Sequence, residues 1–115
     1  MIWIASSREA LRSFPEQVKD AVGYALYLAQ IGGKEEAARP LRGFGSAGVV
    51  EVIKDFAGDT YRAVYTVKFA GFVYVLHCFQ KKSKRGAETP RRDLDLIQSR
   101  LRFAEWDYEA RKGGE

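Results

Sequence analysis

Residues 49–80 read VVEVIKDFAGDTYRAVYTVKFAGFVYVLHCFQ, and this stretch decides the fold class. It contains three runs rich in Val, Tyr and Phe, over residues 49–56, 60–69 and 72–80. Turn signals separate the runs at residues 57–59 and 70–71. Side chains of these types favour strands, and short turns join strands that lie antiparallel to each other. The stretch therefore predicts an antiparallel meander of three strands.

Helical patterns precede the meander. A short strand is expected at residues 2–4, followed by a short helix that Ser7 can cap. Residues 13–16 resemble a capping box with a proline in the first turn, and apolar residues then recur at helical spacing up to Ile31. Two glycines end this second helix. The chain is thus expected to open with a strand and a helical hairpin.

Residues 34–48 are expected to form a loop, because Pro40 and three glycines break regular structure. After the meander, Thr89 and Pro90 provide a cap and a first-turn proline for a final helix. Its inner face is marked by Leu94, Ile97, Leu101, Ala104 and Tyr108. The predicted order is β-α-α-β-β-β-α, an α+β fold in which helices pack on a mainly antiparallel sheet, as one domain over residues 1–115.

The composition narrows the class of protein. With 115 residues and 46% hydrophobic side chains, the chain is expected to bury a core, which argues against disorder. Its single cysteine, Cys78, excludes an internal disulfide and a metal site built on several cysteines. No Asp, Glu and His cluster has the spacing of metal ligands, so we expect no metal and no cofactor. Residues 1–5 are too short for a signal peptide, and no apolar run approaches the roughly 20 residues of a membrane span, so a cytoplasmic protein is expected.

Positive charge gathers after the third strand of the meander. The net charge is +4, and residues 81–92 hold six cations, namely Lys81, Lys82, Lys84, Arg85, Arg91 and Arg92, against Glu88 alone. Such a local field favours a polyanion or an acidic partner. The alternative is a solvated basic loop that keeps the protein soluble.

The expected strand pairing places several of these groups in space. If residues 70–71 close a symmetric hairpin, the facing pairs are Arg62 with Phe79, Val64 with His77, and Thr66 with Val75. Side-chain alternation then gathers Arg62, His77 and Lys81 at one end of one face. A bulge at the turn would shift the pairing by one residue.

Arg62 and His77 each have two interpretations. Arg62 lies within an otherwise strand-like run, where a charge needs a partner. A salt bridge with Glu51 or Asp55 is one interpretation, and a phosphate ligand is the favoured one, because a guanidinium offers planar, permanently charged donors. His77, the single histidine, is either a core or edge residue or a group that binds ligand or transfers a proton near neutral pH.

Three segments together resemble the RelE/HigB superfamily of toxins, most closely its phage-derived HigB-like branch. They are residues 61–65, residues 75–83 and the Thr89-Pro90 pair that opens the last helix. Within the second, residues 76–82 match the branch's strand ending Leu-His-x-Phe-x-Lys-Lys. The resemblance implies a RelE-like fold and the toxin of a type II toxin–antitoxin system.

The resemblance also implies an activity and partners. The activity is that of a metal-independent endoribonuclease that cleaves messenger RNA, commonly on the translating ribosome, and so inhibits translation. The partner is a helix-turn-helix antitoxin of the Xre type, through which alone contact with DNA is expected. No membrane partner is implied.

Site residues follow from the same resemblance. Arg62 is expected to hold the scissile phosphate, Lys81 and Lys82 to bind phosphate and stabilise developing charge, and His77 to occupy the histidine position of the branch. The expected catalytic residues are thus Arg62, His77, Lys81 and Lys82, and the expected RNA-binding residues are Lys54, Lys84, Arg85 and Arg91. Residues 81–102 hold neither the tyrosine nor the histidine that some relatives use for proton transfer. That role falls to His77, Glu51, a lysine of lowered pKa or the ribosome.

Two other functions use the same basic surface. One is a non-catalytic RNA-binding module, in which Tyr61, Tyr65 or Phe79 stack on bases instead of packing in the core. The other is an interaction protein that docks on an acidic partner. Reading of duplex DNA by the chain itself is not expected, because no helix-turn-helix pattern is present.

Overall fold

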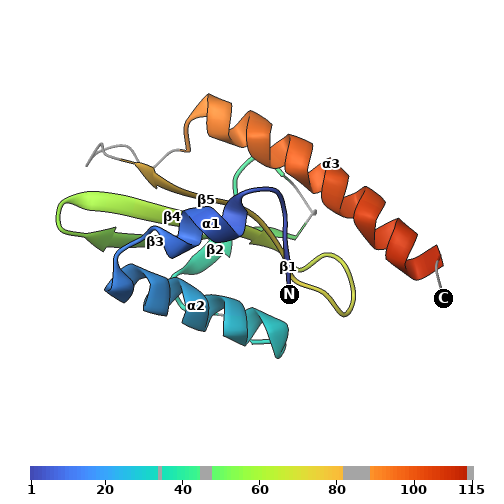
Figure 1. Cartoon of the computed structure of the whole chain (residues 1–115), viewed down its shortest axis with the longest axis horizontal. Helices are drawn as coiled ribbons and strands as arrows, with labels where there is room; N and C mark the ends of the chain where they lie inside the picture. Colours follow the sequence, from blue (N-terminus) through green and yellow to red (C-terminus); the bar gives the residue numbers. More distant parts are fainter. Residues whose placement is uncertain (34, 45–47, 82–88, 114–115) are drawn as a thin grey trace.

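The computed structural model describes residues 1–33, 35–44, 48–81 and 89–113. Along them the elements are β1 (Ile2–Trp3), α1 (Ser7–Arg12), α2 (Glu16–Gln30), β2 (Ala38–Pro40), β3 (Val49–Phe56), β4 (Asp59–Thr66), β5 (Tyr74–Lys81) and α3 (Arg91–Gly113). Over these residues the fold is α+β, with a mixed five-stranded sheet and three helices (Figure 1).

The strands lie in the order β1-β5-β4-β3-β2. β1 runs parallel to β5, and the other neighbours are antiparallel. The predicted meander is confirmed as β3, β4 and β5. Ala57 and Gly58 join β3 to β4 with φ values of 53° and 86°, and positive φ at both central residues is what a tight two-residue hairpin turn needs.

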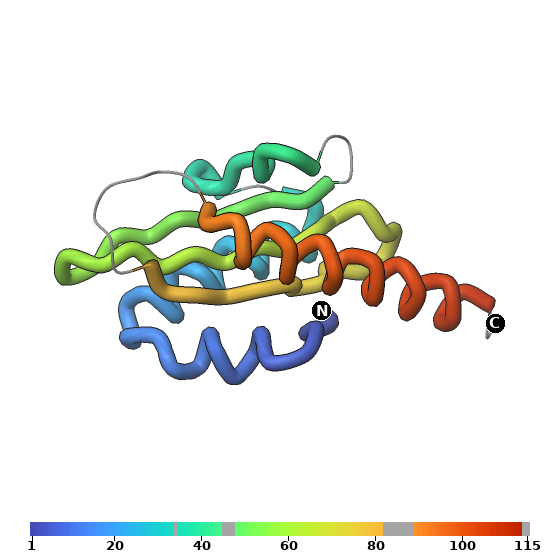
Figure 2. The backbone as a smooth tube through the Cα atoms, turned by 90° about the horizontal axis from the view of Figure 1, so that it is seen from above, coloured from blue at the N-terminus to red at the C-terminus, as the bar shows by residue number. Residues whose placement is uncertain are grey.

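The expectation of a loop over residues 34–48 is wrong at β2. This strand pairs antiparallel with β3 at the edge of the sheet, beside β3 and away from α1 (Figure 2). Pro40 is tolerated because an edge strand has one row of backbone groups without ladder hydrogen bonds. The observed order over the described residues is therefore β-α-α-β-β-β-β-α.

Helices cover both faces of the sheet, so the core has two halves (Figure 1). On one face, α1 and α2 bury a cluster that includes Leu26 and Ala63. On the other face, α3 buries a cluster that includes Val64 and Leu101. Each residue predicted for the inner face of the last helix belongs to this second cluster or packs against it.

The predicted side-chain caps of the first two helices do not form. The N-cap of α1 is Ser6, and the Ser7 hydroxyl instead donates to the Val75 carbonyl at 3.1 Å, because a buried hydroxyl needs a partner within the core. The N-cap of α2 is Pro15, and the Ser13 hydroxyl donates to the carbonyl of Ala10 at 2.7 Å. Ser7 therefore fastens α1 to the sheet.

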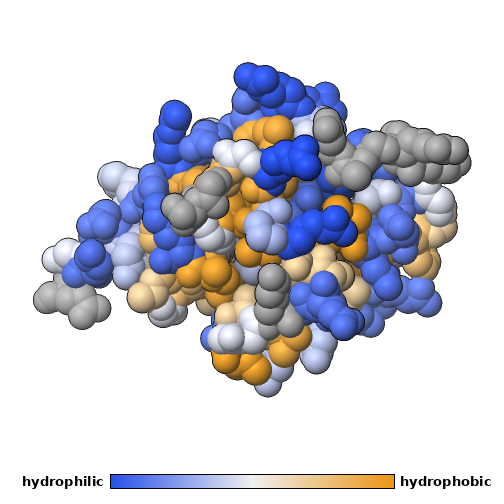
Figure 3. Space-filling model, turned by 180° about the vertical axis from the view of Figure 1, so that it is seen from behind, coloured by the Kyte–Doolittle hydropathy of each residue, from blue (hydrophilic) through white to orange (hydrophobic). Residues whose placement is uncertain are grey.

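The surface is mostly hydrophilic, with apolar side chains reaching it in patches. Figure 3 shows such patches between charged groups on the side opposite to the view of Figure 1. Among the residues that the structure describes, no helix is both long enough and apolar enough to cross a membrane.

Candidate functional site

A polar cluster interrupts the core below the start of α3. Arg62 on β4 is 2% exposed and Glu51 on β3 is 4% exposed. Nη1 of Arg62 donates to Oε2 of Glu51 at 3.1 Å and to Oγ1 of Thr89 at 3.0 Å. The Thr89 hydroxyl donates to the same carboxylate oxygen at 2.8 Å. We call this the Glu51–Arg62–Thr89 cluster, in which two buried charges compensate each other.

Strand register brings the cluster together. Across β3 and β4, Glu51 pairs with Val64 and Ile53 pairs with Arg62, so Glu51 and Arg62 are diagonal neighbours on one face. Thr89 joins them because α3 begins two residues later, at Arg91, directly above this end of the sheet. The salt bridge to Glu51, one of the two interpretations of Arg62, is present, and phosphate binding by Arg62 stays a prediction.

A pocket with a volume of about 490 Å³ opens beside this cluster. Its polar lining consists of Glu51, Thr89 and two exposed arginines, Arg39 and Arg42. The apolar lining consists of Pro40, Leu41, Ile53 and Leu94. Arg39 pairs with Glu51 across the sheet, so both side chains leave the same face. A carboxylate beside two guanidinium groups suits a ligand that carries both an anionic group and a hydroxyl.

His77 makes a second polar contact below α3. Its Nε2 lies 2.8 Å from Oδ1 of Asp93 in the first turn of the helix, and its ring stacks on Phe79 with centroids 4.6 Å apart. Burial lowers the pKa of His77 from its usual 6.5, the hydrogen bond and charge of Asp93 offset part of this, and Arg100 adds to the lowering. The neutral imidazole is therefore favoured at pH 7, in an orientation that Asp93 fixes.

The predicted register is confirmed up to a bulge. Arg62 faces Phe79 and Val64 faces His77, as predicted. Thr66 faces Tyr74 and not Val75, because the register shifts by one residue between Val64 and Tyr65. At the other end of the ladder, Lys81 faces Thr60 and so continues the row of Arg62 and His77.

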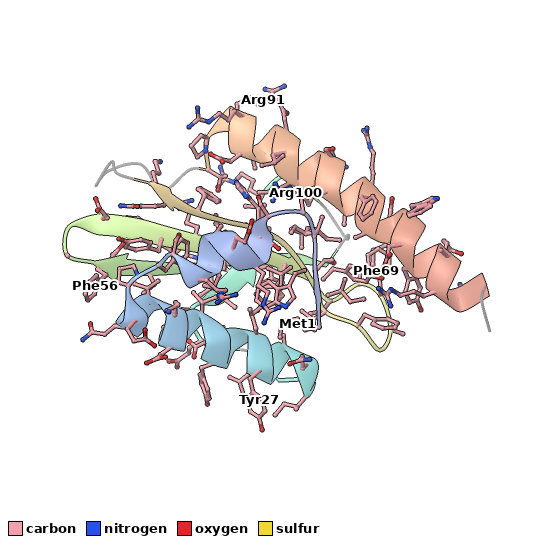
Figure 4. All side chains as sticks on the ribbon, viewed as in Figure 1. Met1, Tyr27, Phe56, Phe69, Arg91 and Arg100 are labelled. Carbon is pink, nitrogen blue, oxygen red and sulfur yellow. The ribbon has the colours of Figure 1, made fainter. Side chains whose placement is uncertain are left out.

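The other predicted RNA contacts are spread out. Lys54 is exposed on β3 opposite Tyr61, which packs in the α1–α2 half of the core, so Lys54 leaves the sheet on the face away from the cluster. Arg91 opens α3 on its outer side, with Nε 3.4 Å from Oδ1 of Asp95 (Figure 4). Lys82, Lys84 and Arg85 lie outside the described residues.

Four residues around the site were not expected there, namely Arg39, Arg42, Thr89 and Asp93. The two arginines were missed because β2 was taken for a loop. Residues 38–41 give only a weak strand signal, because two exposed residues in a row, Arg39 and Pro40, separate buried Ala38 from buried Leu41 and break the period of two. Thr89 was expected to start the last helix and Asp93 was not singled out, and the partners of both depend on how α3 crosses the sheet.

The three aromatic residues considered for stacking on RNA bases differ in how far they are buried. Tyr61 and Tyr65 are buried in the core, which confirms core packing for both and removes them as stacking platforms for RNA bases. Phe79 is half-buried and covers the His77 ring. Within the described ranges, no group of three or more His, Cys, Asp or Glu side chains is placed to hold a metal ion.

One comparison with known proteins gave a match. The model of the family described as "Phage derived protein Gp49-like (DUF891)" matches residues 9–102. The match spans α2, β2 to β5 and the first half of α3, and so includes the cluster, the pocket and His77. Neither the curated proteins nor the solved structures gave a match. Because the family model covers well over half of the chain, the protein belongs to the Gp49-like family of phage-derived proteins.

Proposed function

We propose that the protein is the toxin of a toxin–antitoxin pair and that it cleaves RNA at the Glu51–Arg62–Thr89 cluster. Two findings support the class: the family is associated with toxin–antitoxin modules, and the α+β architecture is compatible with a RelE-like fold. The observation that carries the site is a buried carboxylate held at the edge of a pocket that exposed arginines also line.

The proposed reaction is an internal phosphoryl transfer. The ribose 2′-oxygen attacks the adjacent phosphorus, the new P–O2′ bond forms, and the P–O5′ bond breaks. Glu51 takes the proton of the 2′-hydroxyl, since its carboxylate lines the pocket and Arg62 and Thr89 fix its position. A base held in place in this way typically contributes about 10²–10⁴-fold to the rate.

The arginines stabilise the charge that develops on the phosphate. Arg39 and Arg42 are exposed at the pocket and are placed to contact phosphate oxygens directly. Arg62 is buried behind Glu51, so its charge acts from below the pocket and its main task is to orient the carboxylate. The proposed role of Arg62 is thus less direct than the phosphate contact that the resemblance implies.

The leaving 5′-oxygen needs a proton. His77 is a poor donor near pH 7, because burial lowers its pKa and the neutral form prevails. A lysine is the better source, either Lys81, which ends β5 on the sheet face of Arg62, or Lys82, which follows it in the sequence. In this scheme His77 and Asp93 hold the first turn of α3 over the sheet.

The biological setting completes the proposal. Messenger RNA on the ribosome is the proposed substrate, and a helix-turn-helix antitoxin of the Xre type is the proposed inhibitor. DNA is then contacted through the antitoxin. The six cations in the sequence of residues 81–92 support an RNA ligand, because phosphates attract positive charge without regard to base sequence.

Growth on induced expression tests the proposal. The wild-type protein is expected to arrest growth, and co-expression of the gene next to it to relieve the arrest. The double variant Arg39→Gln/Arg42→Gln should abolish the arrest and should fold, because both side chains are exposed. The matched control is Arg8→Gln/Arg12→Gln, which removes the same charge from exposed positions of α1 and should remain toxic. A folded pocket variant with full toxicity would show that the site is wrong.

A further inference from the structure

The outer face of α3 carries a mostly apolar stripe that does not contribute to the core. It consists of Leu96, Ser99, Phe103, Trp106 and Ala110, and we call it the outer stripe. These residues follow one another at alternating steps of three and four, which is the spacing of a helix that packs along another helix. Leu96, Phe103 and Trp106 are 36%, 50% and 64% exposed, and the two aromatic rings touch, with centroids 5.5 Å apart.

The outer stripe needs a partner other than the sheet. The opposite face of α3 already fills the core through Ile97, Leu101 and Ala104, which are buried. Large apolar groups that gather on one exposed face, here including a tryptophan, mark an interaction surface more often than scattered exposed residues do. The helix is 23 residues long, or about 34 Å, which is long enough to present the whole stripe to another helix.

Charges on both sides of the outer stripe alternate in sign every seven residues. One flank carries Asp95, Arg102 and Glu109, and the other carries Asp93, Arg100 and Asp107. Two such helices can pair antiparallel. If the facing flank residues of the two copies are an odd number of heptads apart in the sequence, each positive residue meets a negative one. The charges therefore point to a second copy of the chain as the occupant.

We propose that two copies associate through this face, with their α3 helices antiparallel. In the register that packs Phe103 against Trp106 of the partner subunit, Arg102 lies beside Glu109 of the partner subunit. By symmetry this pair of charges occurs twice. The register one heptad away brings Arg102 against Arg102 of the partner subunit and is disfavoured by repulsion. The flank charges thus select the register as well as the occupant.

Arg102 and Glu109 are the residues to test, because Arg100 and Asp107 of the other flank are hydrogen-bonded to β5. Arg100 donates to the Leu76 carbonyl at 2.9 Å, and Asp107 accepts from Tyr74 at 2.9 Å. Arg102 is exposed. The Glu109 side chain is 69% exposed, and its ion pair with Lys112, at 3.8 Å, lies in solvent and is weak enough to be exchanged for a partner.

Sedimentation equilibrium over a range of concentrations tests the association. The wild-type mass is expected to rise from 13.0 kDa to twice that value as the concentration increases. Trp106→Ala should raise the dissociation constant at least about tenfold, as the loss of a central aromatic contact does. Tyr24→Ala removes a similarly exposed aromatic side chain from α2, and it should leave the constant unchanged. A wild-type mass that stays at 13.0 kDa at all concentrations overturns the proposal. This holds even if a different protein is found to bind the outer stripe.

A charge exchange tests the antiparallel register. Arg102→Glu alone and Glu109→Arg alone should each weaken the dimer, because each places like charges together. The double variant Arg102→Glu/Glu109→Arg should restore most of the affinity. In a parallel pair, Arg102 would lie beside Asp107 of the partner subunit, and Glu109→Arg would have no effect. That result overturns the antiparallel arrangement. None of these measurements involves RNA, so their outcome is independent of the proposed cleavage.

Discussion

The two faces of the sheet differ in what they bury. Under α1 and α2 the core is apolar, and Val22, Leu26 and Ala63 are at most 1% exposed. Under α3 the apolar core gives way at one end to Glu51 and Arg62, which are also buried, at 4% and 2% exposed. A buried ion pair rarely stabilises a fold more than apolar side chains of similar volume. Stability therefore explains the first face, whereas the polar end of the second face indicates a function.

The largest effect is expected from breaking the buried ion pair. Arg62→Ala leaves the Glu51 carboxylate buried without its countercharge, and should lower the free energy of unfolding by about 3–5 kcal/mol. Urea denaturation measures it. The double variant Glu51→Leu/Arg62→Leu should recover much of the loss, because it removes both charges together. If the double variant is no more stable than Arg62→Ala, the ion pair is needed for stability and is not kept at a cost in stability for the sake of function.

A cavity in the apolar face should reduce stability without touching the chemistry. Leu26→Ala removes a side chain that is 1% exposed, and should lower the free energy of unfolding by about 2–5 kcal/mol. Cleavage per folded molecule should stay at the wild-type level, since α2 lies on the far side of the sheet from the pocket. A specific loss of activity in the folded fraction would contradict this division of the two faces.

Acid should lower the free energy of unfolding through His77, by less than either of these substitutions does. Because the pKa of His77 is lowered in the folded protein, the unfolded chain binds the proton more readily. The free energy of unfolding should therefore be largest above pH 6.5, the usual pKa, and should fall as the pH drops below it. His77→Gln should flatten this dependence between about pH 7.5 and pH 5.5, above the range in which most carboxylates titrate. An unchanged slope in the variant would rule out His77 as its source.

The smallest effect is expected at the solvent-exposed start of α3. The side chains of Arg91 and Asp95 are 87% and 72% exposed, so their ion pair is screened by water. Arg91→Gln should change the free energy of unfolding by less than about 0.5 kcal/mol. Its effect should appear instead as a weaker and less salt-dependent affinity for RNA, measured by fluorescence anisotropy. A stability loss as large as that of Leu26→Ala would contradict this assignment.

Much of the fold was predictable because local patterns determine it. The meander follows from three β-rich runs separated by two turn signals, although the connection from β4 to β5 covers residues 67–73 and is longer than the expected turn. The inner face of α3 follows from apolar residues at helical spacing. β2 was not predictable, because a three-residue edge strand that contains Pro40 carries little periodic signal. The bulge after Val64 was foreseen as a possibility, but only the folded hairpin fixes its position.

The site was predictable only where the sheet alone places it. Arg62 and His77 share a face because of the hairpin register, and this could be worked out from turn positions. Arg39 depends on β2, and Thr89 and Asp93 depend on where α3 crosses the sheet. These contacts join residues 12 to 38 positions apart in the chain, and no local pattern specifies them.

The chemistry of the RNA ends tests the central proposal most directly. Translating ribosomes are incubated with the purified protein, and the fragments are examined for 2′,3′-cyclic phosphate and 5′-hydroxyl ends. We expect these ends with the wild-type protein, a rate at least about a hundredfold lower with folded Glu51→Gln, and an unchanged rate with the control Asp55→Asn on the same strand. Intact RNA with the wild-type protein, or full activity in folded Glu51→Gln, would contradict the assignment of Glu51 as the base of an RNA-cleaving site.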